Sequence, residues 1–369
     1  MSPLTADLLG DLATLVCCES PTSDAAALAR CAEVVATMGE RLLGRAPERV
    51  DADGVPQLSW TATGEPSVLV LGHLDTVWPL GSLATHPWAV HDGQALGPGV
   101  FDMKAGLVMA LHALSALPTP VRDHVTLLVT ADEETGAPTS RDRILREAAR
   151  HRVTLVLEAS ASGGAWKDAR RGVARYTLEV RGRAAHAGLE PHTGINAITA
   201  VSHVAGQVAA LDRFPEGASV TATTLHAGSA INTVPASAHL TLDVRTPSAA
   251  EQARVEEGLG ALDPVVPGAA LVVTGGVTHP PLERAHTAPV LARALAVAAS
   301  IGLEVPPPRA VGGASDGNIA ASVGSLVLDG LGAVGGGAHA DDEHARVADL
   351  APRTDFLTSL VTSLVEDPL

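Results

Sequence analysis

Runs of apolar, often β-branched residues alternate with segments of helical periodicity over the first part of the chain. Strand patterns occupy residues 67–75, 124–132 and 152–160, and helical patterns occupy residues 23–43, 104–114 and 141–150. Unbroken apolar strands that are separated by helices are typical of a buried, largely parallel sheet. We therefore expect an α/β domain with a mostly parallel sheet that is flanked by helices.

The pattern changes at about residue 173. Strand patterns at 173–182, 219–228, 236–245 and 269–276 enclose helical patterns at 194–211 and 248–262. The resulting order, β-α-β-β-α-β, is the ferredoxin-like split motif. Further helix and strand patterns follow at 288–300, 325–330 and 350–367. We therefore expect two domains, one formed by residues 1–172 and 278–369 and one inserted at residues 173–277.

Composition narrows the class of protein. The 369 residues carry a formal net charge of −16, which argues against nucleic-acid binding because that function needs a basic surface stripe. The three cysteines, Cys17, Cys18 and Cys31, include no CxxC pair, so we expect reduced thiols without disulfides or thiolate zinc ligands. The N-terminal segment lacks the basic region of a signal peptide, and no run of about 18 apolar residues occurs. We expect a cytoplasmic protein without membrane spans.

Acidic residues and histidines stand where successive apolar strands end. They are His73, Asp75, Asp102, Glu133, Glu134, Glu158 and, after a later strand, His339. Each position alone is weak evidence, because an isolated HxD sequence or a pair of glutamates is common by chance. The carboxyl ends of parallel strands open onto one crevice, however, so these side chains can converge. Imidazole and carboxylate groups without thiolates suit zinc or a related divalent ion.

The segment TADEETG, residues 130–136, places Asp132, Glu133 and Glu134 side by side. Adjacent carboxylates repel one another, and a divalent cation would neutralise them. Neighbouring residues of a strand point to opposite faces, so Glu133 and Glu134 can share a site only if the strand has already ended. Asp132 stays unassigned, with backbone capping as an option. Asp75 lies on the same strand face as His73 and can accept a hydrogen bond from the second nitrogen of a metal-bound imidazole.

Eight segments occur in an order that resembles a known family. They are HLDTV, GPGVFDMKAG, TADEETG, LEAS, GRAAHAGLEPHTGINAI, INTVPASAHLTLDVR, GGASDGN and GAHADDEHA. Together they resemble the di-zinc exopeptidases that comprise glutamate carboxypeptidases of the carboxypeptidase G type, aminoacylases and N-acyl amino acid deacylases. Ala159 and Ala105 depart from the proline and glycine that are common there, but neither position supplies a side-chain ligand.

The resemblance implies a zinc-exopeptidase-like catalytic domain with two Zn²⁺ ions, for which Co²⁺ or Mn²⁺ are possible substitutes. Asp102 would bridge the ions, His73 and Glu158 would complete one site, and Glu134 and His339 would complete the other. Glu133 would be the general base that generates a metal-bridging hydroxide. The peptide bond between Asp102 and Met103 is expected to be cis.

The inserted ferredoxin-like domain would, by the same resemblance, serve as a lid and as the surface of a homodimer. His186 matches a histidine that reaches the active site of the neighbouring subunit and stabilises an oxyanion. Asn232 and Arg245 match residues that bind substrate, and a guanidinium suits the free carboxylate of a small-molecule substrate. An exposed strand residue without function remains the alternative for Arg245, and whether His186 acts in cis or in trans stays open.

These implications favour a hydrolase that cleaves an amide or peptide bond beside a free carboxylate and releases a C-terminal amino acid such as glutamate. An N-acyl amino acid deacylase is the first alternative, and a non-catalytic metal- or ligand-binding relative is the second. A third alternative, a nicotinamide dehydrogenase, rests on Gly330, Gly332 and Gly335, which form GxGxxG after a strand pattern. No apolar helix follows these glycines, so we interpret them as a flexible approach to His339.

Overall fold

The computed structural model describes residues 2–369, which form two compact units. The first unit runs to Ala169 and resumes at Glu283–Val311 and Ser315–Leu369. The second unit comprises Arg170–Leu282 and Gly312–Ala314. The sequence placed the boundaries at 172/173 and 277/278, so the second unit is slightly longer than expected at each end. The short segment Gly312–Ala314 also groups with the second unit, which no pattern in the sequence indicates.

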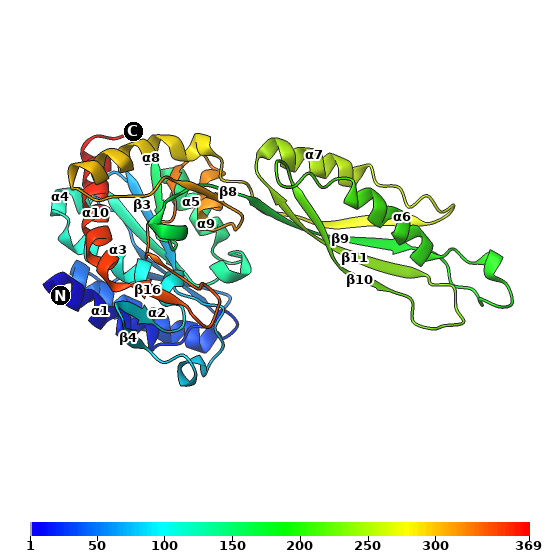
Figure 1. Cartoon of the computed structure of the whole chain (residues 1–369), viewed down its shortest axis with the longest axis horizontal. Helices are drawn as coiled ribbons and strands as arrows, with labels where there is room; N and C mark the ends of the chain where they lie inside the picture. Colours follow the sequence, from blue (N-terminus) through cyan, green and yellow to red (C-terminus); the bar gives the residue numbers. More distant parts are fainter. Residues whose placement is uncertain (1) are drawn as a thin grey trace. The chain divides into compact units, whose positions relative to one another are not determined.

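A six-stranded sheet forms the centre of the first unit (Figure 1). Its strands, in spatial order, are β1 (Glu48–Ala52), β2 (Val55–Trp60), β6 (Val125–Thr130), β3 (Val68–His73), β7 (Val153–Val156) and β14 (Leu326–Leu328). Strands β6, β3, β7 and β14 pair in parallel, whereas β1 and β2 form an antiparallel hairpin that joins β6 at one edge. The mostly parallel sheet that the sequence predicted is confirmed.

Helices cover both faces of this sheet. They are α1 (Pro3–Val16), α2 (Ala25–Leu43), α3 (Ala105–Ala116), α4 (Thr119–Arg122), α5 (Arg141–Arg150), α8 (Arg284–Ser300), α9 (Asp316–Ala321) and α10 (Val347–Glu366). Val68 and Val70 of β3 belong to the same apolar cluster as residues of α3 and α10, while Leu69 is buried towards the opposite face. Because every residue of β3 is buried, this strand has the unbroken apolar pattern of a sheet that is covered on two sides.

Two smaller sheets accompany the central one. The first has the order β15-β16-β5-β4, and the second pairs β13 with β8. Their strands are β4 (Ala89–His91), β5 (Gln94–Leu96), β8 (Lys167–Arg170), β13 (Arg309–Val311), β15 (Gly335–Gly336) and β16 (His344–Arg346). The loop between β15 and β16 carries His339, and the chain after β5 leads to Asp102. The pairing of β16 with β5 therefore brings together two segments that are far apart in sequence.

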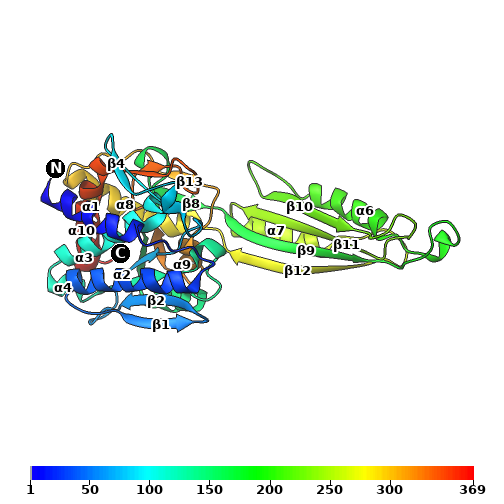
Figure 2. The same ribbon diagram turned by 90° about the horizontal axis from the view of Figure 1, so that it is seen from below.

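The second unit has the element order β-α-β-β-α-β that the sequence predicted. Its elements are β9 (Gly172–Arg181), α6 (Ala197–Ala209), β10 (Ser219–Ala227), β11 (Ser237–Thr246), α7 (Ala249–Gly260) and β12 (Ala270–His279). The strands form an antiparallel sheet in the order β10-β11-β9-β12, and α6 and α7 lie on one face of it (Figures 1 and 2). Every second residue of β11 from Ala238 to Val244 is buried, as the alternation in the sequence predicted.

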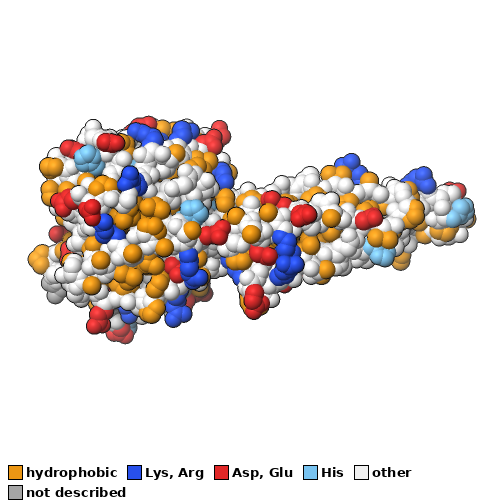
Figure 3. Space-filling view, turned by 90° about the horizontal axis from the view of Figure 1, so that it is seen from above, with side chains coloured by type: hydrophobic (Ala, Val, Ile, Leu, Met, Phe, Trp, Pro, Cys, Tyr) orange, Lys and Arg blue, Asp and Glu red, His pale blue; other side chains and the backbone are white. Residues whose placement is uncertain are grey.

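Charges of both signs are interspersed on the face of the molecule drawn in Figure 3, and no basic stripe crosses that face. This distribution agrees with the negative net charge and gives no support to nucleic-acid binding. Among residues 2–369, no helix combines the length and the apolar character that crossing a membrane requires.

Candidate metal centre

Six side chains of the first unit meet beside the carboxyl ends of its parallel strands. His73 is the last residue of β3, and Glu158 lies two residues beyond β7. Glu133 and Glu134 begin the short helical turn η3 (Glu133–Thr135) that follows β6. Asp102 lies in the irregular turn η2 (Val100–Lys104), and His339 lies in the loop after β15.

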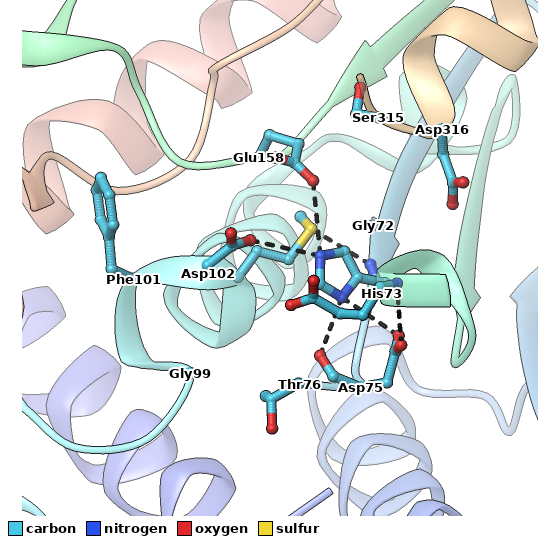
Figure 4. Close-up of polar contacts among 12 residues, drawn as sticks. Gly72, His73, Asp75, Thr76, Gly99, Phe101, Asp102, Glu158, Ser315 and Asp316 are labelled. Atoms are coloured by element: carbon cyan, nitrogen blue, oxygen red, sulfur yellow. Dashed lines mark hydrogen bonds and ion pairs between the residues drawn. The ribbon is translucent and has the colours of Figure 1, made fainter. Parts of the chain in front are cut away.

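Five of these side chains, all except that of Glu133, form two groups of three ligand atoms, and the atoms of each group lie within 4.8 Å of one another. In the first group, the Nε2 atom of His73 lies 3.5 Å from Oδ1 of Asp102 and 3.5 Å from Oε1 of Glu158 (Figure 4). In the second group, the Nε2 atom of His339 lies 3.5 Å from Oδ2 of Asp102 and 3.3 Å from Oε2 of Glu134. Asp102 therefore belongs to both groups and presents one oxygen to each.

The spacing of these atoms fits metal ions better than it fits direct hydrogen bonds. Ligands about 2.0–2.2 Å from a tetrahedral ion are separated from each other by about 3.3–3.6 Å, which matches the observed distances. Nε2 of His73, Oδ1 of Asp102 and Oε1 of Glu134 are buried and have no hydrogen-bond partner. Burying a polar atom without a partner is costly, and a cation at the first group would satisfy two of these atoms, Nε2 of His73 and Oδ1 of Asp102. The residues present thus fit two divalent ions.

The pKa values of these side chains reflect the crowding of charge. Contacts with Asp102 and Glu134 raise the pKa of His339 to about 10. Burial would lower the pKa of His73, but Asp102, Asp75 and Glu158 outweigh it and raise that pKa well above its ordinary value. Burial, followed by the charge of Glu158, raises the pKa of Glu133 well above the usual range, although part of this side chain is accessible to solvent.

The end of β6 explains how Asp132, Glu133 and Glu134 can have different surroundings although they are adjacent in sequence. Because the strand stops at Thr130, Glu133 and Glu134 lie in a helical turn and are not forced to opposite faces of a strand. Asp132, which had no assigned role, is buried and accepts hydrogen bonds from the backbone N–H and hydroxyl groups of both Thr139 and Ser140. It therefore closes the loop that presents the two glutamates.

Asp75 lies beside the imidazole of His73, and the hydrogen bond that we expected for its carboxylate is made instead by its backbone carbonyl oxygen. Nδ1 of His73 is 3.0 Å from the carbonyl oxygen of Asp75 and 3.3 Å from its Oδ1 atom (Figure 4). Its other oxygen, Oδ2, accepts hydrogen bonds from the hydroxyl of Thr22 at 2.8 Å and from the backbone N–H of Glu134 at 3.2 Å. Asp75 thus fixes the orientation of the His73 ring and ties it to the turn that carries Glu134.

The backbone at two of these positions is unusual. The peptide bond between Asp102 and Met103 is cis, which the motif resemblance had implied. His339 adopts a left-handed conformation with φ 63°, which costs a non-glycine residue on the order of 1–3 kcal/mol. Such strain persists where the surrounding structure holds the residue in place, and it is common at ligand-binding positions.

Comparison with known proteins identifies the family. Residues 69–363, most of the chain, match Peptidase family M20/M25/M40. The chain belongs to this family. The resemblance drawn from the eight motifs is thereby confirmed, and membership makes the chain a hydrolytic enzyme of a metal-dependent peptidase and amidohydrolase family.

Individual relatives of this M20 chain differ in how much of it they match. Carboxypeptidase G2 of Pseudomonas sp. (strain RS-16) is 35% identical over 186 residues, which span 49% of this chain and only 45% of that protein. Succinyl-diaminopimelate desuccinylase of Thioalkalivibrio sulfidiphilus (strain HL-EbGR7) is 28% identical over 334 residues, 83% of this chain and 86% of the relative. Aminopeptidase PepT of Bacillus cereus ATCC 10987 shares the fold, with a TM-score of 0.75, 20% identity and 98% of each chain covered.

Metal binding by this M20 chain is expected to release protons and to strengthen as pH rises. The pKa of His339 is raised to about 10, so its imidazole is protonated at neutral pH and must lose a proton before it can bind a cation. The pKa of His73 is raised in the same direction by its carboxylate neighbours. Below the pKa of about 10 for His339, each unit of pH should therefore increase the apparent affinity. Calorimetric titration of Zn²⁺ in buffers of different ionisation enthalpy measures the released protons; an affinity that is constant from pH 6 to pH 8 would contradict the assignment.

In the second unit of the M20 chain, His186 and Asn232 lie on adjacent segments. A β-bridge pairs His186 with Thr233, and the backbone N–H of Ala187 donates to the carbonyl of Asn232 at 2.9 Å. Nδ1 of His186 accepts hydrogen bonds from the backbone N–H groups of Gly188 and Leu189, both at 3.1 Å. The proton of the neutral ring therefore resides on Nε2, which can act as a donor.

Arg245 is already engaged on its own strand. Its Nε and Nη2 atoms donate to the two carboxylate oxygens of Asp243 at 2.7 Å and 3.0 Å. The sequence interpretation of Arg245 as a residue that binds a substrate carboxylate did not include this pairing. Residues i and i+2 of a strand share a face, so the alternation in β11 was sufficient to indicate it.

Other findings in the M20 chain had weaker signals in the sequence or differ from the interpretation given to them. Lys167 is buried with its Nζ atom 3.6 Å from Oε2 of Glu158, and no local pattern in the sequence marks it.

The glycines interpreted as flexible are instead tightly packed: a Cβ atom at Gly332 would overlap the carbonyl oxygen of Leu157, and one at Gly335 would overlap that of His344. Gly335 belongs to β15, and no dinucleotide-binding helix follows.

Proposed function

We propose that the chain is a di-zinc hydrolase that cleaves an amide or peptide bond next to a free carboxylate and releases a C-terminal amino acid such as glutamate. The observation that carries the proposal is the pair of ligand groups that share Asp102, with Glu133 in the adjacent turn. Similarity to carboxypeptidase G2 supports the choice of substrate class. The three free cysteines agree with the cytoplasmic location that we propose for the enzyme.

The side chains of the protein would divide the reaction among them. Bound zinc would supply Lewis-acid polarisation of the scissile carbonyl and lower the pKa of a water molecule. Glu133, whose pKa is raised by burial, would take a proton from the attacking water and deliver it to the leaving amine. Nε2–H of His186 would donate to the developing oxyanion, and Asn232 would also contact the substrate. Arg245 would bind the substrate carboxylate, using the Nη1 group that it does not use towards Asp243.

A deacylase is the second proposal, because similarity to succinyl-diaminopimelate desuccinylase covers more of the chain than the similarity to carboxypeptidase G2. The two activities differ in the acyl group that is removed, while both present an amide beside a carboxylate. A hydrolysis panel of the zinc-loaded enzyme separates them if it contains dipeptides with C-terminal glutamate and N-succinyl and N-acetyl amino acids. Substrates with an amidated C-terminus serve as the control. Equal turnover of free and amidated substrates would contradict both proposals.

We also propose that the enzyme is a homodimer formed through its inserted unit. Leu189, Ile198, Leu225 and Ile231 are large apolar side chains that this unit exposes, and β10 is an unpaired edge of its sheet. Exposed apolar groups and free strand edges mark surfaces that pair with another chain. A second copy would also bring a second His186 to the enzyme.

Complementation between two inactive variants is expected if His186 acts in the partner subunit. A His186→Ala chain keeps Glu133, and a Glu133→Gln chain keeps His186, so each mixed dimer regains one complete site. Random assembly should restore roughly one quarter of wild-type activity, because half of the dimers are mixed and each has one working site. Activity assays after joint refolding measure the recovery. No recovery at all would indicate that His186 acts within its own chain or that the enzyme is a monomer.

A further inference from the structure

Glu343 is a buried carboxylate with four hydrogen-bond donors around it. The residue is only 4% exposed. Oε1 accepts from the backbone N–H groups of Phe101 at 2.9 Å and Asp102 at 3.0 Å, and Oε2 accepts from that of Gly99 at 3.0 Å. Nε1–H of Trp78 donates to Oε2 at 2.6 Å. These hydrogen bonds offset part of the cost of burying the carboxylate, although burial still raises its pKa.

The three backbone donors belong to the segment that presents the shared ligand Asp102. This segment is irregular: Gly99 has φ 70°, and Asp102 itself has φ −117° and ψ 97° inside the turn η2. An irregular backbone has no periodic acceptors for its N–H groups, so a side chain must supply them. Glu343 does so from a position 241 residues later in the chain than Asp102. It lies in the same loop between β15 and β16 as the ligand His339.

We infer that Glu343 is a positioning residue for the metal centre, which holds the Asp102 segment and the His339 loop in register so that each oxygen of Asp102 faces its own ligand group. The inference rests on the proposed metal-dependent function. Glu343 belongs to neither group of ligand atoms, so it acts through Asp102 and His339 rather than on an ion. A carboxylate is required because both of its oxygens accept hydrogen bonds from N–H groups.

The substitution Glu343→Gln tests this role with almost no change in volume. An amide has one acceptor oxygen, and its NH₂ group would confront at least one N–H donor, so part of the clamp must open. We expect the folded variant to bind Zn²⁺ and Co²⁺ about 10- to 100-fold more weakly, as is usual when a partner of a metal ligand is lost. Because Asp102 is shared, both ions should be affected. Competition with a chelator measures the affinities, and the visible absorption of bound Co²⁺ reports the ligand geometry.

Glu19→Gln is the matched control. The carboxylate of Glu19 also accepts two backbone hydrogen bonds, from Gly81 and Leu83, both at 2.9 Å, but it contacts no ligand residue. A purely structural role for such clamps predicts similar effects of the two substitutions, whereas the positioning role predicts altered Co²⁺ affinity and absorption in Glu343→Gln alone. Glu343→Asp, which keeps the charge but shortens the side chain, should recover part of the lost affinity.

The outcomes separate this inference from the proposed function. Wild-type affinity and an unchanged Co²⁺ spectrum in Glu343→Gln would overturn the positioning role. Failure of the wild-type protein to bind two ions would overturn the metal-dependent function itself. If Glu343→Gln does not fold, Glu343→Asp decides in the same assays, because its shorter side chain cannot reach all of the backbone N–H groups that Glu343 contacts. Co²⁺ binding weaker than that of the wild type in Glu343→Asp supports the role, and wild-type affinity with an unchanged spectrum overturns it.

Discussion

Replacing Glu133 by glutamine is expected to lower kcat by about 10²- to 10⁴-fold while both metal ions stay bound, since this is the usual contribution of a general base. Glu133 belongs to neither group of ligand atoms, so removal of its charge leaves the coordination intact. Glutamine cannot accept a proton at neutral pH, so the attacking water and the leaving amine lose their proton carrier. Steady-state kinetics together with metal analysis of the same sample test both halves of the expectation.

Two further carboxylate-to-amide changes make that experiment specific. Glu134→Gln, one residue away, alters a ligand and should lose metal at the second group. Glu65→Gln changes an exposed glutamate away from the centre and should behave as wild type. Near wild-type turnover in Glu133→Gln would contradict the assignment of Glu133 as the general base. Loss of metal from that variant would indicate that Glu133 is a metal ligand instead.

Replacing Asp102 by alanine is expected to empty both metal positions and to reduce hydrolysis to background. Asp102 is the one described residue that belongs to both ligand groups, so its loss leaves each ion with two of the three identified ligands. His339→Ala is the matched comparison, because it removes a ligand from the second group only and should leave the ion at His73 in place. Elemental analysis of the purified variants gives the stoichiometry directly.

Thermal unfolding adds a second measure to the Asp102 experiment. An ion that binds only the folded state stabilises it by about 2.7 kcal/mol when its concentration is one hundred times Kd. Added Zn²⁺ should therefore raise the Tm of the wild-type protein and leave that of Asp102→Ala nearly unchanged. One ion retained at full occupancy in Asp102→Ala would show that this carboxylate is not shared.

Much of the central sheet could be predicted because its inner strands are unbroken apolar runs. Every residue of β3, β6 and β7 is buried, and this requirement is visible in the sequence. The hairpin of β1 and β2 was missed because β1 is mostly exposed and polar, so no apolar run marks it. Its turn, Asp53–Gly54, has positive φ at both residues, and an Asp-Gly pair is a known hairpin signal that we did not use.

The ligand positions could be predicted for a related reason: parallel strands place their carboxyl ends together, and the residues at those ends can be read from the sequence. The contacts that support the ligands could not be predicted. Glu343 reaches backbone groups more than 240 residues away, and Lys167 approaches Glu158 from a segment without a strand-end signal. Such contacts depend on how loops pack in three dimensions, which neither periodicity nor composition encodes.

The two histidine ligands differ in exposure, and this asymmetry has a kinetic consequence. The side chain of His73 is 2% exposed and that of His339 is 49% exposed. Water and competing chelators can reach the second position directly, whereas the first is enclosed by protein. The ion beside His339 would exchange with the medium while the ion beside His73 is retained for long periods. The fraction of active enzyme would then rise and fall with the free metal concentration in the surrounding medium.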